Sequence, residues 1–185
     1  HPYAMSAFLH VPISLFYNTE VSGYGLENKT LNDLAARVLA CEENGSCISL
    51  IEQWLLSQVA INFASKREAD MDRIAAVVRQ MYVTPNRPIS ELASIACLGK
   101  KQFERLFFAA VGMNPKEYAR LVRFQKSLRL MQCSAGNISQ AQIAYQCGYS
   151  DQSHFIREFR KLSGYTPLSL VTVCKPYSDL FTSPV

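Results

Sequence analysis

Two stretches of the chain repeat one pattern of apolar and small residues. In the later stretch Phe155 and Phe159 stand four positions apart, which places them on one face of a helix. The same intervals of 4, 5 and 3 positions separate Phe103, Phe107, Gly112 and Pro115, and then Phe155, Phe159, Gly164 and Pro167. Upstream the match extends to Ala93 and Ala144, with one extra residue in the second turn. The pattern predicts two diverged helix-turn-helix units.

Each unit ends in a helix with an apolar face and a polar face. We predict the first such helix over about residues 100–110 and the second after a turn near Gly148. Spacing of three and four turns Phe103, Leu106 and Phe107 inward in the first helix. The outward-facing candidates for contact with a partner are Lys101, Gln102, Glu104, Arg105 and Phe108 in the first helix, and Gln152, Ser153, Arg157, Arg160 and Lys161 in the second.

Start and stop signals predict the helices that support these two. A helix that begins at Asp70 or Asp72 ends before a turn at residues 86–88, and a positioning helix follows over residues 89–96. Both helices belong to the first helix-turn-helix motif. The second motif begins at Ile138.

A long helix is predicted between the two units. Asn114 caps it, Pro115 begins it, and it extends to about residue 133. Its roughly 18 residues span about 27 Å at about 1.5 Å per residue, which approaches the rise of one DNA turn, about 34 Å. Such a helix can hold two recognition helices at that separation.

The first 70 residues carry a different pattern. The apolar stretch over residues 4–25 is interpreted as two strands interrupted at Pro12. Thr30 is a candidate cap for a helix that extends to Cys41. A second helix is predicted over about residues 49–63, and apolar residues cover much of its circumference, which demands burial on more than one side. The two helices form a hairpin.

We therefore expect a mainly α fold, with two helix-turn-helix motifs joined by a long linker helix and preceded by a short segment of strands and a helical hairpin. The charged residues 64–70 are the candidate linker between the parts. The chain divides into an N-terminal region of residues 1–70, a helix-turn-helix region of residues 71–173 and an irregular tail of residues 174–185.

Charge separates the same regions. Residues 71–173 carry 14 Lys and Arg against 6 Asp and Glu, whereas residues 1–70 carry 4 against 8. The net charges are +8 and −4, the tail is neutral, and the chain totals +4. A basic region beside an acidic one fits a module that binds polyanions, attached to a part with another task. A chance distribution of surface charge explains the composition equally well.

The six cysteines show no C-x-x-C pair, and with three histidines they predict no zinc site. We expect no signal peptide and no membrane-spanning run, and hence a cytoplasmic protein with free thiols, no membrane contact and no cofactor. A redox-sensing pair of Cys41 and Cys47 is the alternative for two of these residues.

One family matches these motifs. The stretch GYSDQSHFIREFRKLSGYTP, residues 148–167, resembles the AraC/XylS transcription regulators, and the resemblance covers roughly residues 72–170. The matching positions are Gly148, Asp151, Ser153, Phe155, Arg157, Phe159, Gly164 and Pro167. The block GMNPKEYARLVRFQKSLRL, residues 112–130, is similar to the family's linker helix and the end of its first motif. Phe108 departs from the family, which more often has a polar or basic residue there, and Leu170 stands where an aromatic is common.

The resemblance implies a bacterial-type DNA-binding transcription regulator that is not an enzyme. It implies a longer N-terminal sensing or dimerisation domain, so we expect this chain to be a fragment or trimmed form with an unknown effector. For the helical hairpin it implies a dimerisation surface, and packing within the chain is the alternative. The expected partners are duplex DNA, with RNA polymerase and a second copy bound through residues 31–63 as candidate protein partners.

The outward residues suit the reading of base edges. Arg donates two hydrogen bonds to guanine, Gln bonds adenine bidentately and Glu accepts from cytosine. The candidate readers are Lys101, Glu104 and Arg105 in one segment, and Gln152, Ser153 and Arg157 in the next. The candidates for phosphate contact, or for simple solvation, are Arg120, Lys126, Arg129, Arg160 and Lys161. The alternatives are an enzyme, for which no Ser/His/Asp or carboxylate group stands out, and a protein-interaction module that kept the fold and lost DNA binding, which Phe108 and Glu104 would suit.

Overall fold

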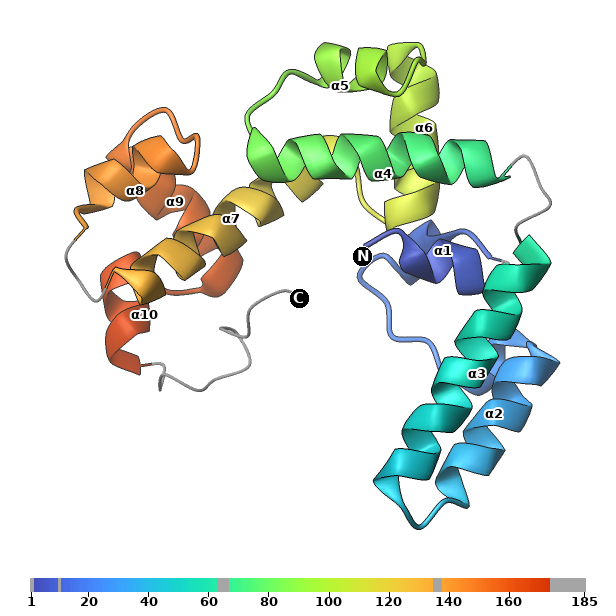
Figure 1. Cartoon of the computed structure of the whole chain (residues 1–185). Coiled ribbons are helices and arrows are strands. Elements are labelled where there is room, and N and C mark those ends of the chain that lie inside the picture. The colour runs from blue at the N-terminus through green and yellow to red at the C-terminus, as the bar shows by residue number, and fades with distance from the viewer. Residues whose placement is uncertain (1, 10, 63–66, 135–137, 174–185) are drawn as a thin grey trace. The chain divides into compact units, whose positions relative to one another are not determined.

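The chain is helical throughout its described part. The computed structural model describes residues 2–9, 11–62, 67–134 and 138–173. Every regular element within these ranges is a helix (Figure 1). The predicted mainly α fold is therefore confirmed. The chain divides into two compact units, His1–Ala76 with Ala96–Asn114, and Val77–Ile95 with Pro115–Val185.

The N-terminal strands that the sequence suggested are wrong. Within the described residues this segment forms α1 (Ala4–Phe8) and two short 3₁₀ helices, η1 (Ile13–Phe16) and η2 (Gly23–Leu26). Runs this short and apolar do not distinguish strand from helix by period. Pro12 supplies the fixed φ, here −61°, immediately before η1. The proline therefore starts a helical turn instead of interrupting a strand.

The helical hairpin is present, with boundaries that differ from the prediction. Helix α2 (Lys29–Leu39) is capped by Asn28, whose side chain accepts from the backbone N–H of Leu31 at 3.1 Å. Thr30 instead donates its hydroxyl to Asn28, so the predicted cap was two residues late. Helix α3 (Asn44–Asn62) begins five residues before the predicted Ser49. The expected end at residue 63 lies outside the described residues.

The first unit packs its helices around α3 and α6 (Lys100–Val111). Helices α1 and α2 both contact α3, and the ring of Phe8 lies 6.5 Å from that of Trp54 between centroids. The indole N–H of Trp54 also donates to the hydroxyl of Thr30 at 3.2 Å. The hairpin thus packs within the first compact unit. Packing within the chain was one of the two roles that the sequence analysis gave for the hairpin, beside dimerisation.

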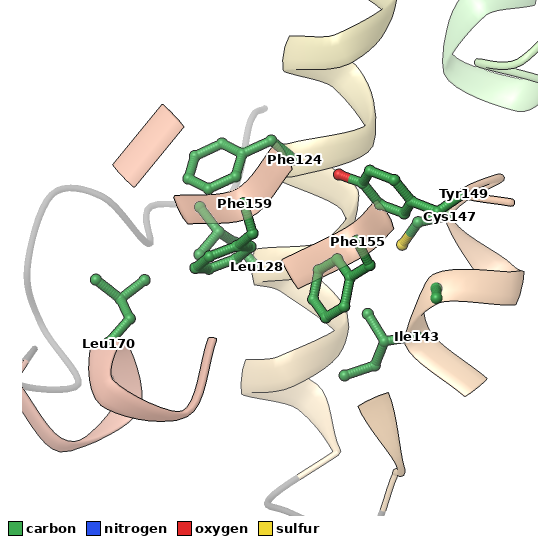
Figure 2. Close-up of a cluster of buried hydrophobic side chains, with 9 residues drawn as sticks. Phe124, Leu128, Ile143, Cys147, Tyr149, Phe155, Phe159 and Leu170 are labelled. Atoms are coloured by element: carbon green, nitrogen blue, oxygen red, sulfur yellow. The ribbon is translucent and has the colours of Figure 1, made fainter. Parts of the chain in front are cut away.

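The second unit forms around α7 (Pro115–Cys133), whose predicted bounds are confirmed. Helices α8 (Gln140–Gln146) and α9 (Gln152–Ser163) contact α7, and α10 (Pro167–Val173) contacts α9. Figure 2 shows the core that they share. Its buried members are Phe124, Leu128, Ile143, Ala144, Cys147, Tyr149, Phe155, Phe159 and Leu170.

Three further boundaries complete the comparison. Helix α5 (Ile89–Ile95) confirms the positioning helix, and α4 (Arg67–Val83) begins three residues before the earlier of its two predicted starts. Residues 64–66 of the candidate linker and the tail 174–185 lie outside the described residues. Helix α10 was not predicted, although Thr166 accepts from the N–H of Ser169 at 3.2 Å and Pro167 occupies the first helical position.

Candidate nucleic-acid interface

The second recognition helix, α9, begins in a fixed cap. Asp151 accepts the backbone N–H of His154 through Oδ1 at 2.7 Å. This hydrogen bond is the main reason that the pKa of Asp151 lies below its usual range. The hydroxyl of Ser150 lies 2.9 Å from His154 Nδ1, and the ring of Tyr149 meets His154 edge-on. The cap therefore orders the turn and the helix start together.

The buried face of α9 rests on two aromatic rings. Phe155 and Phe159 are fully buried, with ring centroids 5.5 Å apart. Phe159 also lies 4.9 Å from Phe124 of α7. Because these rings fix the rotation of α9 about its axis, the opposite face is presented to solvent.

That opposite face carries all five outward residues predicted for this helix. Gln152, Ser153, Arg157, Arg160 and Lys161 are exposed. Arg160 and Lys161 lie in the last turn, where a cation is favoured by the helix dipole. Gln152 is not free in this structure, since its amide donates to the Gln140 side chain of α8 at 3.2 Å.

The first recognition helix, α6, has the same division of faces. Phe103 and Phe107 are fully buried, with centroids 5.7 Å apart. Lys101, Gln102 and Arg105 are exposed and surround an open hollow in the surface. Glu104 is half-buried. The predicted outward residues of this helix therefore also lie on its accessible side.

An ion pair ties α9 to α7. Nε and Nη2 of Arg120 donate to the two carboxylate oxygens of Glu158, the latter at 3.2 Å. Burial raises the pKa of Glu158, but the hydrogen bond and charge of Arg120 outweigh it and lower the pKa overall. The prediction that Arg120 contacts phosphate or stays solvated is wrong. Sequence gave no signal for this pair, because 38 positions separate the partners.

Arg123 also works inside the protein. Its guanidinium lies 5.2 Å from the ring centroid of Tyr149, the buried residue that follows the turn glycine of the second motif. Burial raises the pKa of the Tyr149 phenol above its usual range. A neutral ring under a cation is a favourable arrangement at this depth. Arg120 and Arg123 thus orient the second motif on α7.

The cysteines divide by environment. Burial raises the pKa of Cys147 to about 11, so its thiol stays protonated in the core of the second unit. Cys41 lies in the connection between α2 and α3, and Cys47 lies in the first turn of α3. Burial, together with the neighbouring Cys41, raises the pKa of Cys47. The Cys47 thiol donates to the carbonyl of Val38 at 3.7 Å.

Similarity to known proteins agrees with this arrangement. Residues 92–171 match a family described as a helix-turn-helix domain. The probable transcriptional regulator LumQ of Photobacterium leiognathi is 30% identical over 124 residues, which are 65% of this chain and 48% of that protein. The HTH-type transcriptional regulator GlxA of Rhizobium meliloti is 31% identical over 99 residues, 52% of this chain and 30% of that protein.

A third relative matches a shorter segment. The HTH-type transcriptional activator RhaS of Pectobacterium carotovorum is 39% identical over 59 residues, 32% of this chain and 20% of that protein. The chain thus spans about half the length, or less, of these relatives. Among the helices of the described residues, none is both long and apolar enough to cross a membrane.

Proposed function

Because residues 92–171 place this chain among the AraC/XylS family of DNA-binding transcription regulators, we propose that it binds specific DNA sequences through α6 and α9. The observation that carries the proposal is common to both helices. In each, two fully buried phenylalanines four residues apart face the core, while basic and amide side chains occupy the accessible side. An α-helix presented in this way fits the major groove.

We assign base reading to the residues nearest the start of each helix, because recognition helices contact base edges with their N-terminal residues. In α6 these residues are Lys101, Gln102, Glu104 and Arg105, and in α9 they are Gln152, Ser153 and Arg157. Arg160 and Lys161, in the last turn of α9, are assigned to phosphate. Arg120 has no part in the interface, because it is paired with Glu158.

The proposal extends to the length of the site. The 19 residues of α7, which stand between the two motifs in the chain, span about 28 Å at about 1.5 Å per residue. A monomer then contacts two successive major-groove segments on one side of the DNA, centred about 10 base pairs apart. The site is asymmetric, because the two reading helices carry different side chains.

Selection of bound duplexes from random DNA tests this function. We expect one asymmetric site with two preferred segments. Inserting about 5 base pairs between the segments turns one of them to the opposite side of the DNA. If binding is indifferent to the insertion and footprinting shows protection of one groove only, the two-helix proposal fails. If no sequence is enriched over random duplex, sequence-specific binding fails altogether.

A second surface supports self-association. The hairpin of α2 and α3 leaves several large apolar side chains exposed, namely Leu39, Ile48, Ile51 and Leu56. We propose that two copies of the chain associate through residues 31–63. We also propose that the protein acts in the cytoplasm, and that an effector and RNA polymerase are further partners of the whole protein. Sedimentation of Leu56→Glu against the unaltered chain tests the dimer. A monomer in both cases contradicts it.

A further inference from the structure

The N-terminal segment covers the C-terminal part of the first recognition helix. η1 packs against α6, and the two lie together in the first unit (Figure 1). The ring of Tyr17, which follows η1, lies 6.2 Å from that of Phe108 between centroids. Ile13, at the start of η1, is buried. We call residues 13–17 the N-terminal strap.

The strap approaches the end of α6 at a glycine. A Cβ placed on Gly112 would lie 3.0 Å from Cγ2 of Ile13 and 3.2 Å from its carbonyl oxygen. The equivalent residue of the second motif, Gly164, has nothing within 4 Å of such a Cβ. Both glycines have positive φ, +83° and +78°. Among the described residues, the first motif has such a neighbour at this glycine and the second motif does not.

Tyr17 brings the strap to the side of α6 that is proposed to read DNA, through its ring contact with Phe108. Phe108 stands three positions after Arg105 and seven after Lys101, so the three share one helical face. The major groove is about 12 Å wide and a helix with its side chains is about 10–12 Å across. A helix therefore fills the groove, and an aromatic ring packed on its groove-facing side has no room to enter with it.

We infer that the N-terminal strap and DNA compete for this face of α6, so that docking of residues 13–17 restrains the first motif and gives the N-terminal region control over it. The inference rests on the proposed DNA binding by α6. It also explains Phe108, the apolar residue in a polar stripe: its ring packs against Tyr17. Because linkage is reciprocal, DNA bound to α6 weakens the docking of the strap by the same factor.

Tyr17→Ala in the full chain tests the competition. The probe is a duplex that carries a site selected from random DNA by the unaltered chain, with two derivatives in which one or the other segment is scrambled. The segment read by α6 is the one whose preference Arg105→Ala relaxes. We expect Tyr17→Ala to bind the intact duplex about two- to tenfold more tightly, the range that loss of an aromatic pair corresponds to.

That gain must depend on the segment read by α6. It disappears on the duplex in which this segment is scrambled and remains when the other is scrambled. Unchanged or weaker binding by Tyr17→Ala, with the unaltered chain still binding its site, overturns the inference and leaves the proposed function intact. Failure of the unaltered chain to select any site overturns the proposed function and the inference together.

A second measurement reports the strap directly. Hydrogen exchange at the amides of Leu15 and Tyr17, which are bonded to the carbonyls of Pro12 and Ser14, is expected to accelerate when DNA is added. Gly112→Ala accelerates it without DNA, because the new methyl group meets Ile13. Gly164→Ala introduces the same backbone strain with no strap beside it, and it leaves these amides unchanged. Slower exchange on DNA binding contradicts competition.

Discussion

The two helix-turn-helix motifs share a skeleton and differ in how the recognition helix is held. Both recognition helices are 12 residues long and are followed by a glycine with positive φ. Arg105 and Arg157 stand at equivalent positions, 52 residues apart, as the buried phenylalanine pairs do. The side chains that fix the helices are not equivalent. Glu158, which pairs with α7, corresponds to Leu106 in the first motif.

The helix starts show the contrast most clearly. Asp151 caps the start of α9 with its side chain, whereas Gly99, at the same place before α6, provides no side-chain hydrogen bond. Four residues separate α5 from α6, and five separate α8 from α9. The extra residue, Ser150, takes part in the capping network through His154. The second motif thus contains its own fixings, while the first is contacted by the N-terminal strap.

The two copies of the motif therefore differ in which contacts fix the recognition helix. α9 is fixed by its own cap and by an ion pair to α7 within the second compact unit. Within the described residues α6 has no side-chain cap and no ion pair to another helix, and it contacts the N-terminal strap instead. The first motif is therefore the better point for the N-terminal region to act on.

The largest effect is expected from the buried phenylalanines, which are equivalent in the two motifs. Phe159→Ala removes a fully buried ring that contacts Phe124 and Phe155, and we expect a loss of about 3–5 kcal/mol in the free energy of unfolding. Phe107→Ala is the matched change in the first motif, since Phe107 is buried to the same degree. Chemical denaturation measures both.

Hydrogen exchange shows where each loss falls. Phe159→Ala is expected to deprotect α8 and α9 and leave α6 protected, and Phe107→Ala the reverse, because the two rings belong to different compact units. If either variant deprotects both recognition helices equally, the motifs unfold as one cooperative structure and the comparison between them loses its basis.

The second effect concerns DNA. Arg157→Ala and Arg105→Ala remove equivalent arginines from the two faces that are proposed to read DNA. Each is expected to weaken specific binding by about 1–3 kcal/mol and to relax the preference at one or two positions. The relaxed positions lie in different segments of the site for the two variants. Selection of bound sites by each variant measures this, and unchanged specificity removes that arginine from the reading set.

Lys161→Ala is the control for these variants. Lys161 lies in the last turn of α9, and its loss is expected to weaken all sequences alike and to reduce the salt slope by about one unit. A change in sequence preference on Lys161→Ala would instead assign it to base reading.

The third effect distinguishes the motifs by pH. Glu158→Gln breaks a half-buried ion pair and is expected to cost about 1–2 kcal/mol at neutral pH. The pKa of Glu158 is lower in the folded state than in the unfolded chain. Its contribution is therefore complete above the unfolded pKa of about 4.3 and is lost as pH falls through the folded value. Glu158→Gln lacks this part of the acid dependence.

Arg120→Gln checks the cause. It removes the same ion pair from the other side, so it also abolishes that part of the acid dependence. The double variant is expected to lose less stability than the sum of the two single losses, because both changes remove one shared interaction. Urea denaturation between pH 7 and about pH 3 measures all three. An acid dependence that survives in Glu158→Gln assigns it to other carboxylates.

Sequence predicted best where one local signal decides the structure. The repeated spacing located α6 and α9, and Asn114 with Pro115 located α7. It failed where the deciding contact is distant. Nothing near Arg120 points to Glu158, and nothing near Phe108 points to Tyr17, which lies 91 positions away.

The incorrect prediction of strands in the N-terminal segment has another cause. The apolar run around Pro12 is too short for its period to separate strand from helix. Asn28 and Thr30 are both good caps two residues apart, and only the observed bond to Leu31 decides between them. The roles of the outward residues in DNA binding stay predictions, because exposure is compatible with contact and does not require it.

The fourth effect lies in the turns. Gly148 has φ of +78°, and a Cβ there would lie 3.3 Å from the side chain of Asn86. Gly148→Ala is therefore expected to cost about 1–2 kcal/mol. The equivalent residue Cys97 already holds φ of +54° with a side chain. Cys97→Gly relieves that strain and is expected to stabilise the first motif by up to about 1 kcal/mol.

Denaturation of the two turn variants gives the signs. Opposite signs mean that the turns share one backbone conformation and differ only in how well the residue suits it. If Cys97→Gly destabilises the chain, the Cys97 side chain contributes more by packing than its backbone strain costs.

The smallest effect is an exchange of helix caps. Gly99→Asp supplies the side-chain acceptor that α6 lacks, and Asp151→Gly removes the one that α9 has. Each is expected to change the free energy of unfolding by a few tenths of a kcal/mol, in opposite directions, since glycine is only slightly poorer than aspartate as a cap.

Gly99→Asp also places a negative charge at the helix start proposed to face DNA, so binding should weaken although the helix is better capped. Gly99→Asn separates the two consequences, because asparagine caps equally well without the charge. Stability that rises in both variants, with DNA affinity lowered only by Gly99→Asp and restored toward the unaltered value at high salt, locates the start of α6 at the phosphates. Equal DNA affinity for the aspartate and asparagine variants would place the start of α6 away from DNA, and the first motif would then read its segment in another way than the second.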